Sequence, residues 1–367
     1  MNPAPSRPDM FSKGNPRLQV AWDATSMNAL LKCGRYYDYT INHGWRKSSV
    51  HLEFGGFLAD GFEVFQKARL AGDDLDTAIL AGLKRVMELS WNEDGTQWGG
   101  YWEDQWKCDG SVKYKNAKGN AAKCPYSHKR MWFPPDAPDV CGECGGGIIH
   151  AKNYCPDHPT KHRINLARAI VWYGLDQPET LTDGLHPFQF PDGTPAVELS
   201  WRLPLPRKAP HGDVYLLCGH FDYIGVYGDE VGIVDNKTTK NTLGGSYFGT
   251  FSPHVQMDTY DMAAPILFPD IDFSWVCIDA IQIMKDTIRT GRHFIRKSNL
   301  QRKEHYDTIM EVIDRAEKYA EVDKWPMDKS SCSMCEFKKV CSAPVEDRPG
   351  LLAQDFKTDF WNPMRNR

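Results

Sequence analysis

Apolar residues recur every three to four positions in three stretches near the start of the chain, a spacing that predicts amphipathic helices. We predict helices over residues 26–40, 54–70 and 75–91, which together would form a helical layer. In the first of them Leu30, Leu31 and Tyr37 lie at helical spacing, and Ser26 is the expected N-cap. Cys33 should therefore lie within a helix.

The chain changes character between residues 92 and 163, which are rich in Gly, Pro, Lys, Trp and Cys and poor in aliphatic side chains. Such a composition cannot build a hydrophobic core of its own. We expect this stretch to be an insertion that a metal ion or the main domain orders.

Strand and helix patterns alternate in the second half of the chain. Strands are predicted at residues 197–203, 214–227, 231–236, 275–284 and 293–297, and helices at 165–173, 252–268 and 300–319. Gly228 and Asp229 form a turn, so the second and third strands should pair as a hairpin. This order predicts an α/β fold with a mixed central sheet flanked by helices. We divide the chain into an N-terminal helical part (1–91), the insertion (92–163), a core (164–345) and a C-terminal tail (346–367).

The 367 residues carry a formal net charge of −4, so the chain as a whole does not attract polyanions. Binding to DNA would need a local basic surface, for which the candidates are Lys285, Arg289, Arg292, Arg296 and Lys297. A solvated strand edge explains the same run equally well. No segment approaches the ~20 apolar residues of a membrane span, and the N-terminus has no apolar signal stretch, so we expect a cytoplasmic protein.

Two acids and a lysine lie on the predicted hairpin. Asp222 is on its first strand, and Asp235 and Lys237 lie two positions apart on the second, so these two side chains point to one face. Two carboxylates suit Mg²⁺ or Mn²⁺, and an adjacent lysine can orient a water or stabilise charge on a phosphate. An ordinary hairpin with exposed charges is the alternative for this pattern taken alone.

The surrounding residues carry a resemblance. With a Gly-x-x-Asp step one strand earlier, Asp222, Asp235 and Lys237 resemble the active-site core of the PD-(D/E)XK nucleases. Gln256 and Tyr260 resemble the Gln-x-x-x-Tyr motif of the RecB-like branch of that superfamily, and their spacing places them on one helix face. The resemblance implies a PD-(D/E)XK nuclease core in which Gln256 and Tyr260 contact the active-site lysine or the DNA.

Three further acids are candidate metal ligands by the same resemblance. Residues 56–60 are similar to a Gly-x-x-x-His motif of the branch, with Asp60 where a histidine is expected, and Glu63 lies one turn further on. Glu198 resembles an acid that often precedes the first catalytic strand. The implied Mg²⁺ or Mn²⁺ ligands are therefore Asp222 and Asp235 with Asp60, Glu63 or Glu198.

Eleven cysteines in a chain without a secretion signal indicate metal binding rather than disulfides. Cys332, Cys335 and Cys341 form a Cys-x2-Cys-x5-Cys run, and Cys33 is the expected fourth thiolate. Four thiolates suit either Zn²⁺ or an iron-sulfur cluster, and spacing does not distinguish them. The arrangement is similar to that of the iron-sulfur RecB-like nucleases, including the CRISPR-associated exonucleases and the AddB nuclease domain, which implies a structural [4Fe-4S] cluster.

A second group of cysteines lies in the insertion. Cys141, Cys144, Cys155 and His158 have a zinc-ribbon-like spacing, so we predict a closed structural Zn²⁺ site there. Cys108, Cys124 and His128 offer a partial set without a fourth ligand, and we expect Cys108 and Cys124 to be free thiols.

The sequence thus predicts a Mg²⁺- or Mn²⁺-dependent DNA nuclease, most simply an exonuclease, acting in DNA repair, recombination, phage replication or CRISPR adaptation. One alternative is a nuclease fold without activity that binds DNA or a partner such as a recombinase, since Asp60 replaces the expected histidine. The other is an adaptor protein in which all the cysteine sites hold Zn²⁺.

Overall fold

The computed structural model describes residues 10–47, 49–92, 94–127, 138–177, 184–285 and 287–366. The chain forms two compact units, the first made of Met1–Arg85 and Arg168–Arg367 and the second of Val86–Ala167. The stretch expected as an insertion, residues 92–163, lies inside the second unit. Throughout the described ranges, no helix has the length and apolar character that crossing a membrane requires.

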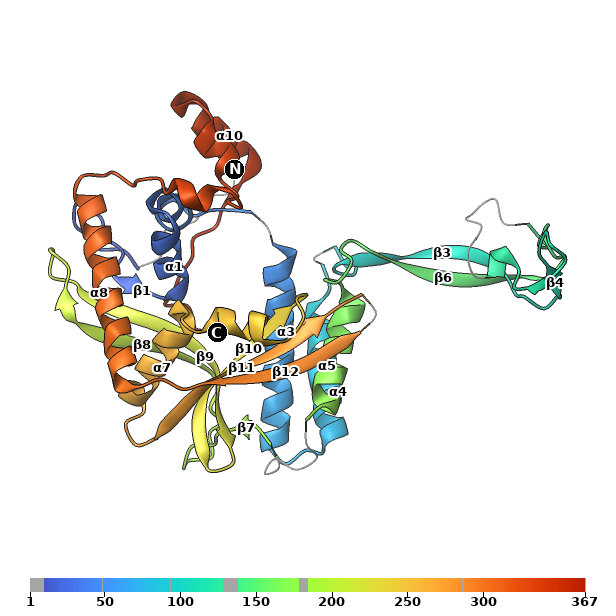
Figure 1. Ribbon diagram of the computed structural model, residues 1–367, viewed down its shortest axis with the longest axis horizontal. Helices are drawn as coiled ribbons and strands as arrows, with labels where there is room; N and C mark the ends of the chain where they lie inside the picture. The colour runs from blue at the N-terminus through green and yellow to red at the C-terminus, as the bar shows by residue number, and fades with distance from the viewer. Residues whose placement is uncertain are drawn as a thin grey trace. The chain divides into compact units, whose positions relative to one another are not determined.

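A seven-stranded mixed sheet forms the centre of the first unit (Figure 1). Its path runs β1-β9-β10-β11-β12, and β7 and β8 also pair with β9. The pairs β1-β9 and β10-β11 are parallel, and the other pairs are antiparallel. The strands are β1 (Ala21–Trp22), β7 (His186–Pro187), β8 (Val197–Lys208), β9 (Val214–Tyr227), β10 (Glu230–Thr239), β11 (Phe273–Ile283) and β12 (Ile288–Ile295).

Helices cover the sheet, which confirms the predicted α/β class. The α-helices are α1 (Ala24–Lys32), α2 (Gly34–Tyr37), α3 (Val50–Leu70), α4 (Leu75–Leu89), α5 (Arg163–Leu175), α6 (Gly245–Phe248), α7 (Val255–Leu267), α8 (Asn299–Glu321), α9 (Lys338–Ser342) and α10 (Arg348–Asp355). Helix α7 connects the parallel strands β10 and β11, because parallel neighbours need a crossover connection.

Strand β11 is buried on both faces, which explains its mostly apolar sequence. On one face Val276 and Ile278 belong to a core shared with α1, α7 and α8. On the other face Trp275 and Cys277 belong to a second core, against which Leu70 at the end of α3 packs. The period-two alternation of strand side chains therefore separates two helical layers.

The helix predicted over residues 26–40 is wrong in one respect, because it is interrupted at Cys33. Asp23, not Ser26, caps α1: its side chain accepts a hydrogen bond from the Ser26 backbone N–H, and the Ser26 hydroxyl completes the capping box. Cys33 has an extended backbone (φ −173°) and lies between α1 and α2. After α2 the chain continues as a π-helical turn, Asp38–Asn42.

The C-terminal segment returns to this N-terminal region. A short strand β13 (Lys357–Thr358) pairs antiparallel with β2 (Trp45–Arg46). Phe337, Val340, Leu352 and Phe356 form a small core with Tyr36 and Tyr39 packed against it. Residues from both ends of the chain thus share one cluster.

The second unit is a long two-stranded ribbon of β3 (Gly100–Cys108) and β6 (Ile148–Pro156) (Figure 1). A small hairpin of β4 (Tyr114–Lys115) and β5 (Ala121–Ala122) and a 3₁₀ turn η2 (Pro125–Ser127) follow β3. The buried cluster near them consists of Cys108, Cys124 and Cys141. Thiols thus occupy the place that aliphatic side chains fill in the first unit.

Candidate active site

The hairpin of β9 and β10 brings two acids together. Tyr227 pairs with Glu230 across the two-residue turn, and the ladder continues to the pair Tyr223 and Val234. Asp222 and Asp235 occupy the next positions of the two strands. The backbone N–H of the following residue, Asn236, donates a hydrogen bond to Asp222 Oδ2 at 2.6 Å, which fixes that carboxylate.

Lys237 and two residues of α7 complete the group. Lys237 Nζ lies 2.5 Å from Asp235 Oδ2. Gln256 Nε2 donates to Asp235 Oδ1 at 3.0 Å and to the Tyr260 hydroxyl at 2.8 Å, while Gln256 Oε1 accepts from Lys237 Nζ at 3.1 Å. The Gln256 amide therefore joins the acid, the lysine and the tyrosine. The structure thus groups the five residues that the sequence predicts as active-site residues: Asp222, Asp235, Lys237, Gln256 and Tyr260.

Electrostatic crowding marks the site. Burial, followed by the negative charges of Asp235 and Glu198, raises the pKa of Asp222 to about 8, although Lys237 and the Asn236 amide oppose this shift. Asp235 is itself almost fully buried, at 1% exposure. Two or three buried carboxylates with one lysine are short of positive charge, and a divalent cation would correct the balance.

Glu198 lies across from Asp222, because its neighbours Val197 and Leu199 pair with Tyr223 and Phe221. Its backbone has a φ of +54°, a left-handed conformation that is strained for a residue with a side chain. Its carboxylate contacts His220 Nε2.

Sequence reasoning missed His220 as a member of the site. Its Nε2 contacts Glu198, and its Nδ1 lies 2.9 Å from the Ser200 hydroxyl. His220 precedes Asp222 by two positions on β9, so both lie on one face of the strand. The two-residue spacing of His220 and Asp222 is the sequence feature from which His220 could have been predicted.

Asp60 and Glu63, two of the acids predicted as metal ligands, form ion pairs with residues outside the hairpin. The Asp60 carboxylate pairs with Arg85 at 2.8 Å, and Glu63 pairs with Lys67 one turn along α3. Among the described residues, no hydrogen bond or ion pair links either acid to Asp222 or Asp235.

The basic run expected to bind DNA is largely neutralised. Arg292 lies 3.2 Å from the buried Asp279, Arg296 forms a two-pronged contact with Glu230, and Lys297 pairs with Asp258. These acids come from β11, β10 and α7, so the sequence did not place them beside the run. Lys285 and Arg289 are exposed.

The four cysteines proposed as cluster ligands line one pocket. Cys33 is beside Cys332, Cys335 and Cys341, and the aromatic rings of Tyr36, Tyr39 and Phe337 complete the wall. The backbone N–H of Asp328 donates to Cys33 Sγ at 3.3 Å. The pocket thus joins the N-terminal and C-terminal segments.

The predicted zinc set is corrected by the structure. Cys141 and Cys144 group with Cys108 and Cys124, which were expected to be free thiols. Cys155 Sγ instead contacts Glu103, and His158 Nδ1 accepts backbone N–H bonds from Thr160 and Lys161. His128 lies outside the described residues.

The register of the ribbon gives the physical reason for this correction. Cys108 pairs with Ile148 at one end of the β3-β6 ribbon, whereas Cys155 pairs with Tyr101 near the other end. Seven residues of extended strand separate Ile148 from Cys155, a distance of about 24 Å at ~3.4 Å per residue. Cys155 therefore cannot share an ion with Cys141 and Cys144.

The chain has distant similarity to solved structures. The chain's similarity to solved structures includes a candidate exonuclease from Eubacterium rectale, at 11% identity and a TM-score of 0.43, with 89% of each chain covered. It also includes the protein SSO0001, at 17% identity and a TM-score of 0.22, with 40% of this chain and 59% of that chain covered. At these values neither likeness carries a functional conclusion.

No curated protein sequence matches the chain. The family model of the PD-(D/E)XK nuclease superfamily matches residues 152–342, a span that contains the hairpin acids, Lys237 and the two residues of α7. Since this match extends over more than half of the sequence, the chain belongs to the PD-(D/E)XK nuclease superfamily.

Proposed function

We propose that the chain is a Mg²⁺- or Mn²⁺-dependent deoxyribonuclease that acts as an exonuclease on DNA ends or single strands. The observation that carries the proposal is the meeting of Asp222 and Asp235 at the hairpin, with the Lys237 ammonium 2.5 Å from Asp235. Membership of the nuclease superfamily supports the same reaction, hydrolysis of a phosphodiester bond.

Asp222, Asp235 and Glu198 are the proposed metal ligands, because hard carboxylate oxygens suit Mg²⁺ and Mn²⁺. A divalent ion held there supplies positive charge at the scissile phosphate and lowers the pKa of its water. These three acids lie on the paired strands β8, β9 and β10. Asp60 and Glu63 lie on α3 and form ion pairs with Arg85 and Lys67, so the proposed set does not include them.

Lys237 is proposed to orient the attacking water and to stabilise negative charge on the phosphate. Its contacts with Asp235 and Gln256 fix the direction of its ammonium group. Gln256 is a positioning residue in this scheme, because its amide holds Asp235 and Lys237 through two separate hydrogen bonds. The exposed Lys285 and Arg289 remain the proposed DNA contacts of the basic run.

We further propose that Cys33, Cys332, Cys335 and Cys341 hold a [4Fe-4S] cluster with a structural role. The observation that supports this proposal is that all four cysteines line one pocket with an aromatic wall. A cluster that links such distant segments stabilises the fold, because it reduces the conformational entropy of the unfolded chain.

The test is cleavage of end-labelled DNA by anaerobically purified protein, with single-stranded, double-stranded and RNA substrates and with or without Mn²⁺. We expect metal-dependent mononucleotide or short products from DNA, lost in Asp235→Asn and kept in Asp229→Asn, which changes an exposed acid in the turn of the same hairpin. Activity that survives Asp235→Asn would overturn the proposed site. A wild-type protein that binds DNA but never cuts it would favour a binding role.

A further inference from the structure

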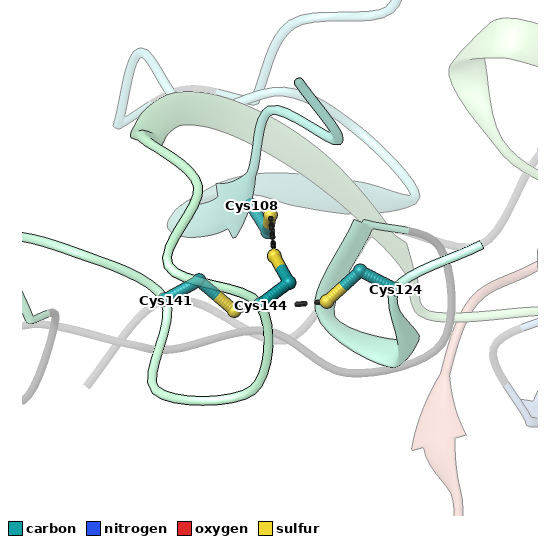
Figure 2. Close-up of side chains that lie close together, drawn as sticks. All are labelled: Cys108, Cys124, Cys141 and Cys144. Atoms are coloured by element: carbon teal, nitrogen blue, oxygen red, sulfur yellow. Dashed lines mark hydrogen bonds between the residues drawn. The ribbon is translucent and has the colours of Figure 1, made fainter. Parts of the chain in front are cut away.

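The second unit contains four cysteines that the nuclease reaction does not use. Figure 2 shows their side chains pointing toward one another from the end of β3, from the residue before η2, and from the loop that precedes β6. We propose that Cys108, Cys124, Cys141 and Cys144 bind one Zn²⁺ ion, and that this ion folds the end of the ribbon. The proposal goes beyond the nuclease activity and does not depend on it.

The size of the site fits a single ion. The four Sγ atoms lie within 4.8 Å of one another, and the contacts are 3.3 Å for Cys108 to Cys144 and 3.6 Å for Cys124 to Cys141. A Zn–S bond of ~2.3 Å in tetrahedral geometry requires Sγ atoms about 3.8 Å apart. A cluster of four iron and four sulfide ions would need thiolates that lie farther apart than these.

Backbone N–H groups already point at the sulfur atoms. Gly110 N–H donates to Cys108 Sγ at 3.4 Å, the Tyr126 amide serves Cys124, and the amides of Glu143 and Cys144 serve Cys141. Hydrogen bonds of this kind stabilise the thiolate, which is the form that binds a metal. Three of the four sulfur atoms therefore already have backbone donors of the kind that a metal-bound thiolate would accept.

Glycines next to the cysteines are required by the same geometry. Gly145, directly after Cys144, has a φ of +72°, which side-chain-bearing residues rarely adopt. A Cβ atom on Gly146 would lie 3.2 Å from Cys108 Sγ and 3.3 Å from Cys144 Sγ. The loop thus leaves space around the sulfur atoms that a larger residue would fill.

The described residues give the ribbon end a small core. Among them, the buried cluster consists of Cys108, Cys124 and Cys141, with Tyr114, Tyr126, Cys144 and Ile148 packed against it. So few apolar contacts cannot offset the entropy of ordering the hairpin and loops around them. Metal binding supplies that free energy in small cysteine-rich units.

Two rival arrangements make different predictions. The first is the zinc set Cys141, Cys144, Cys155 and His158, which the ribbon register separates. The second is a pair of disulfides joining Cys108 to Cys144 and Cys124 to Cys141. The observed sulfur contacts exceed the ~2.05 Å of a covalent S–S bond, and all four cysteines are free thiols in the structure.

The experiment measures zinc per chain in the full-length protein after anaerobic purification, for the wild type, Cys144→Ser and Cys155→Ser. We expect Cys144→Ser to lose about one zinc ion per chain and Cys155→Ser to keep it. The comparison between two cysteine variants of the same unit cancels any zinc held elsewhere in the chain. Equal zinc loss in both variants, or loss only in Cys155→Ser, would overturn the assignment.

The wild-type chain provides a second measurement that does not depend on the folding of a variant. X-ray absorption at the zinc edge should show four sulfur neighbours at ~2.3 Å. A shell that includes a nitrogen neighbour at ~2.0 Å would indicate a histidine ligand and refute the four-cysteine site. Iron in place of zinc at the site would refute it as well. So would a chain mass that is lower by four hydrogen atoms under non-reducing denaturing conditions, because that mass indicates two disulfides.

Discussion

Gln256 gives the sharpest test of how the active-site group is held together. Its side chain makes two hydrogen bonds to charged partners, Asp235 and Lys237, and one to the neutral Tyr260 hydroxyl. A hydrogen bond to a charged group contributes about 1.5 kcal/mol at the lower end of measured values. Gln256→Ala removes both of these hydrogen bonds, at a cost of about 3 kcal/mol. If the whole cost raises the free energy of the transition state, kcat decreases roughly a hundred-fold.

The assay is single-turnover cleavage of end-labelled DNA under the conditions in which the wild type is active. Gln256→Ala should lower the cleavage rate with little change in DNA affinity, because Gln256 positions groups rather than binding the substrate. Gln256→Glu should be impaired as strongly, since it keeps the shape but places a carboxylate oxygen where Nε2 donates to Asp235. Gln189→Ala is the matched control, because that glutamine is exposed and its side-chain amide donates to the Gly193 carbonyl in its own turn.

Two results would refute this reasoning. A cleavage rate within about two-fold of the wild type in Gln256→Ala would show that Asp235 and Lys237 hold each other without the amide. A normal rate in Gln256→Glu, together with a slow Gln256→Ala, would show that only the volume of the side chain matters.

Three further predictions concern stability and the cysteine pocket. Because burial and then the charge of Asp235 raise the pKa of Asp222 from 3.8 to about 8, the metal-free folded chain retains a proton that the unfolded chain has lost, so its unfolding free energy should fall as the pH rises between about 5 and 8. The unfolding free energy of Asp222→Asn, measured by urea titration at several pH values, should depend less on pH than that of the wild type. An unchanged pH dependence would contradict this assignment. Asp279→Ala should lower the unfolding free energy by about 3–5 kcal/mol, because it leaves the partly buried Arg292 without its counterion, whereas Glu230→Ala at an exposed ion pair should cost less than about 1 kcal/mol in the same titration. Iron and sulfide analysis of anaerobic protein should find a cluster that Cys335→Ser loses and Cys155→Ser retains; equal loss in both would exclude the pocket as its site.

Local pattern was sufficient for the part of the site that lies on two adjacent elements. The turn at Gly228 and Asp229 sets the register of β9 and β10, and the alternation of a strand then puts Asp235 and Lys237 on one face. The four-residue spacing of Gln256 and Tyr260 places both on one face of α7. Helix α7 is part of the crossover between β10 and β11. Its face with Gln256 therefore contacts Asp235 and Lys237 on β10.

Pattern failed where the partner of a residue comes from a distant element. The ion-pair partners of Arg292 and Lys297, Asp279 on β11 and Asp258 on α7, are remote in the sequence and become neighbours only in the folded chain. Arg292 and Lys297 therefore balance buried or half-buried acids, which the pattern of the basic run alone does not predict.

The cysteines of the ribbon show the same limit in its strongest form. Cys141 and Cys144 are close in sequence, and their spacing to Cys155 and His158 is typical of a zinc ribbon. Strand pairing determines which cysteines are neighbours. Strand β6 leads away from the loop that contains Cys141 and Cys144, so Cys155 lies far from it, whereas the antiparallel strand β3 ends at this loop with Cys108. Spacing along a chain predicts a metal site only when the intervening residues turn back, and an extended strand does the opposite.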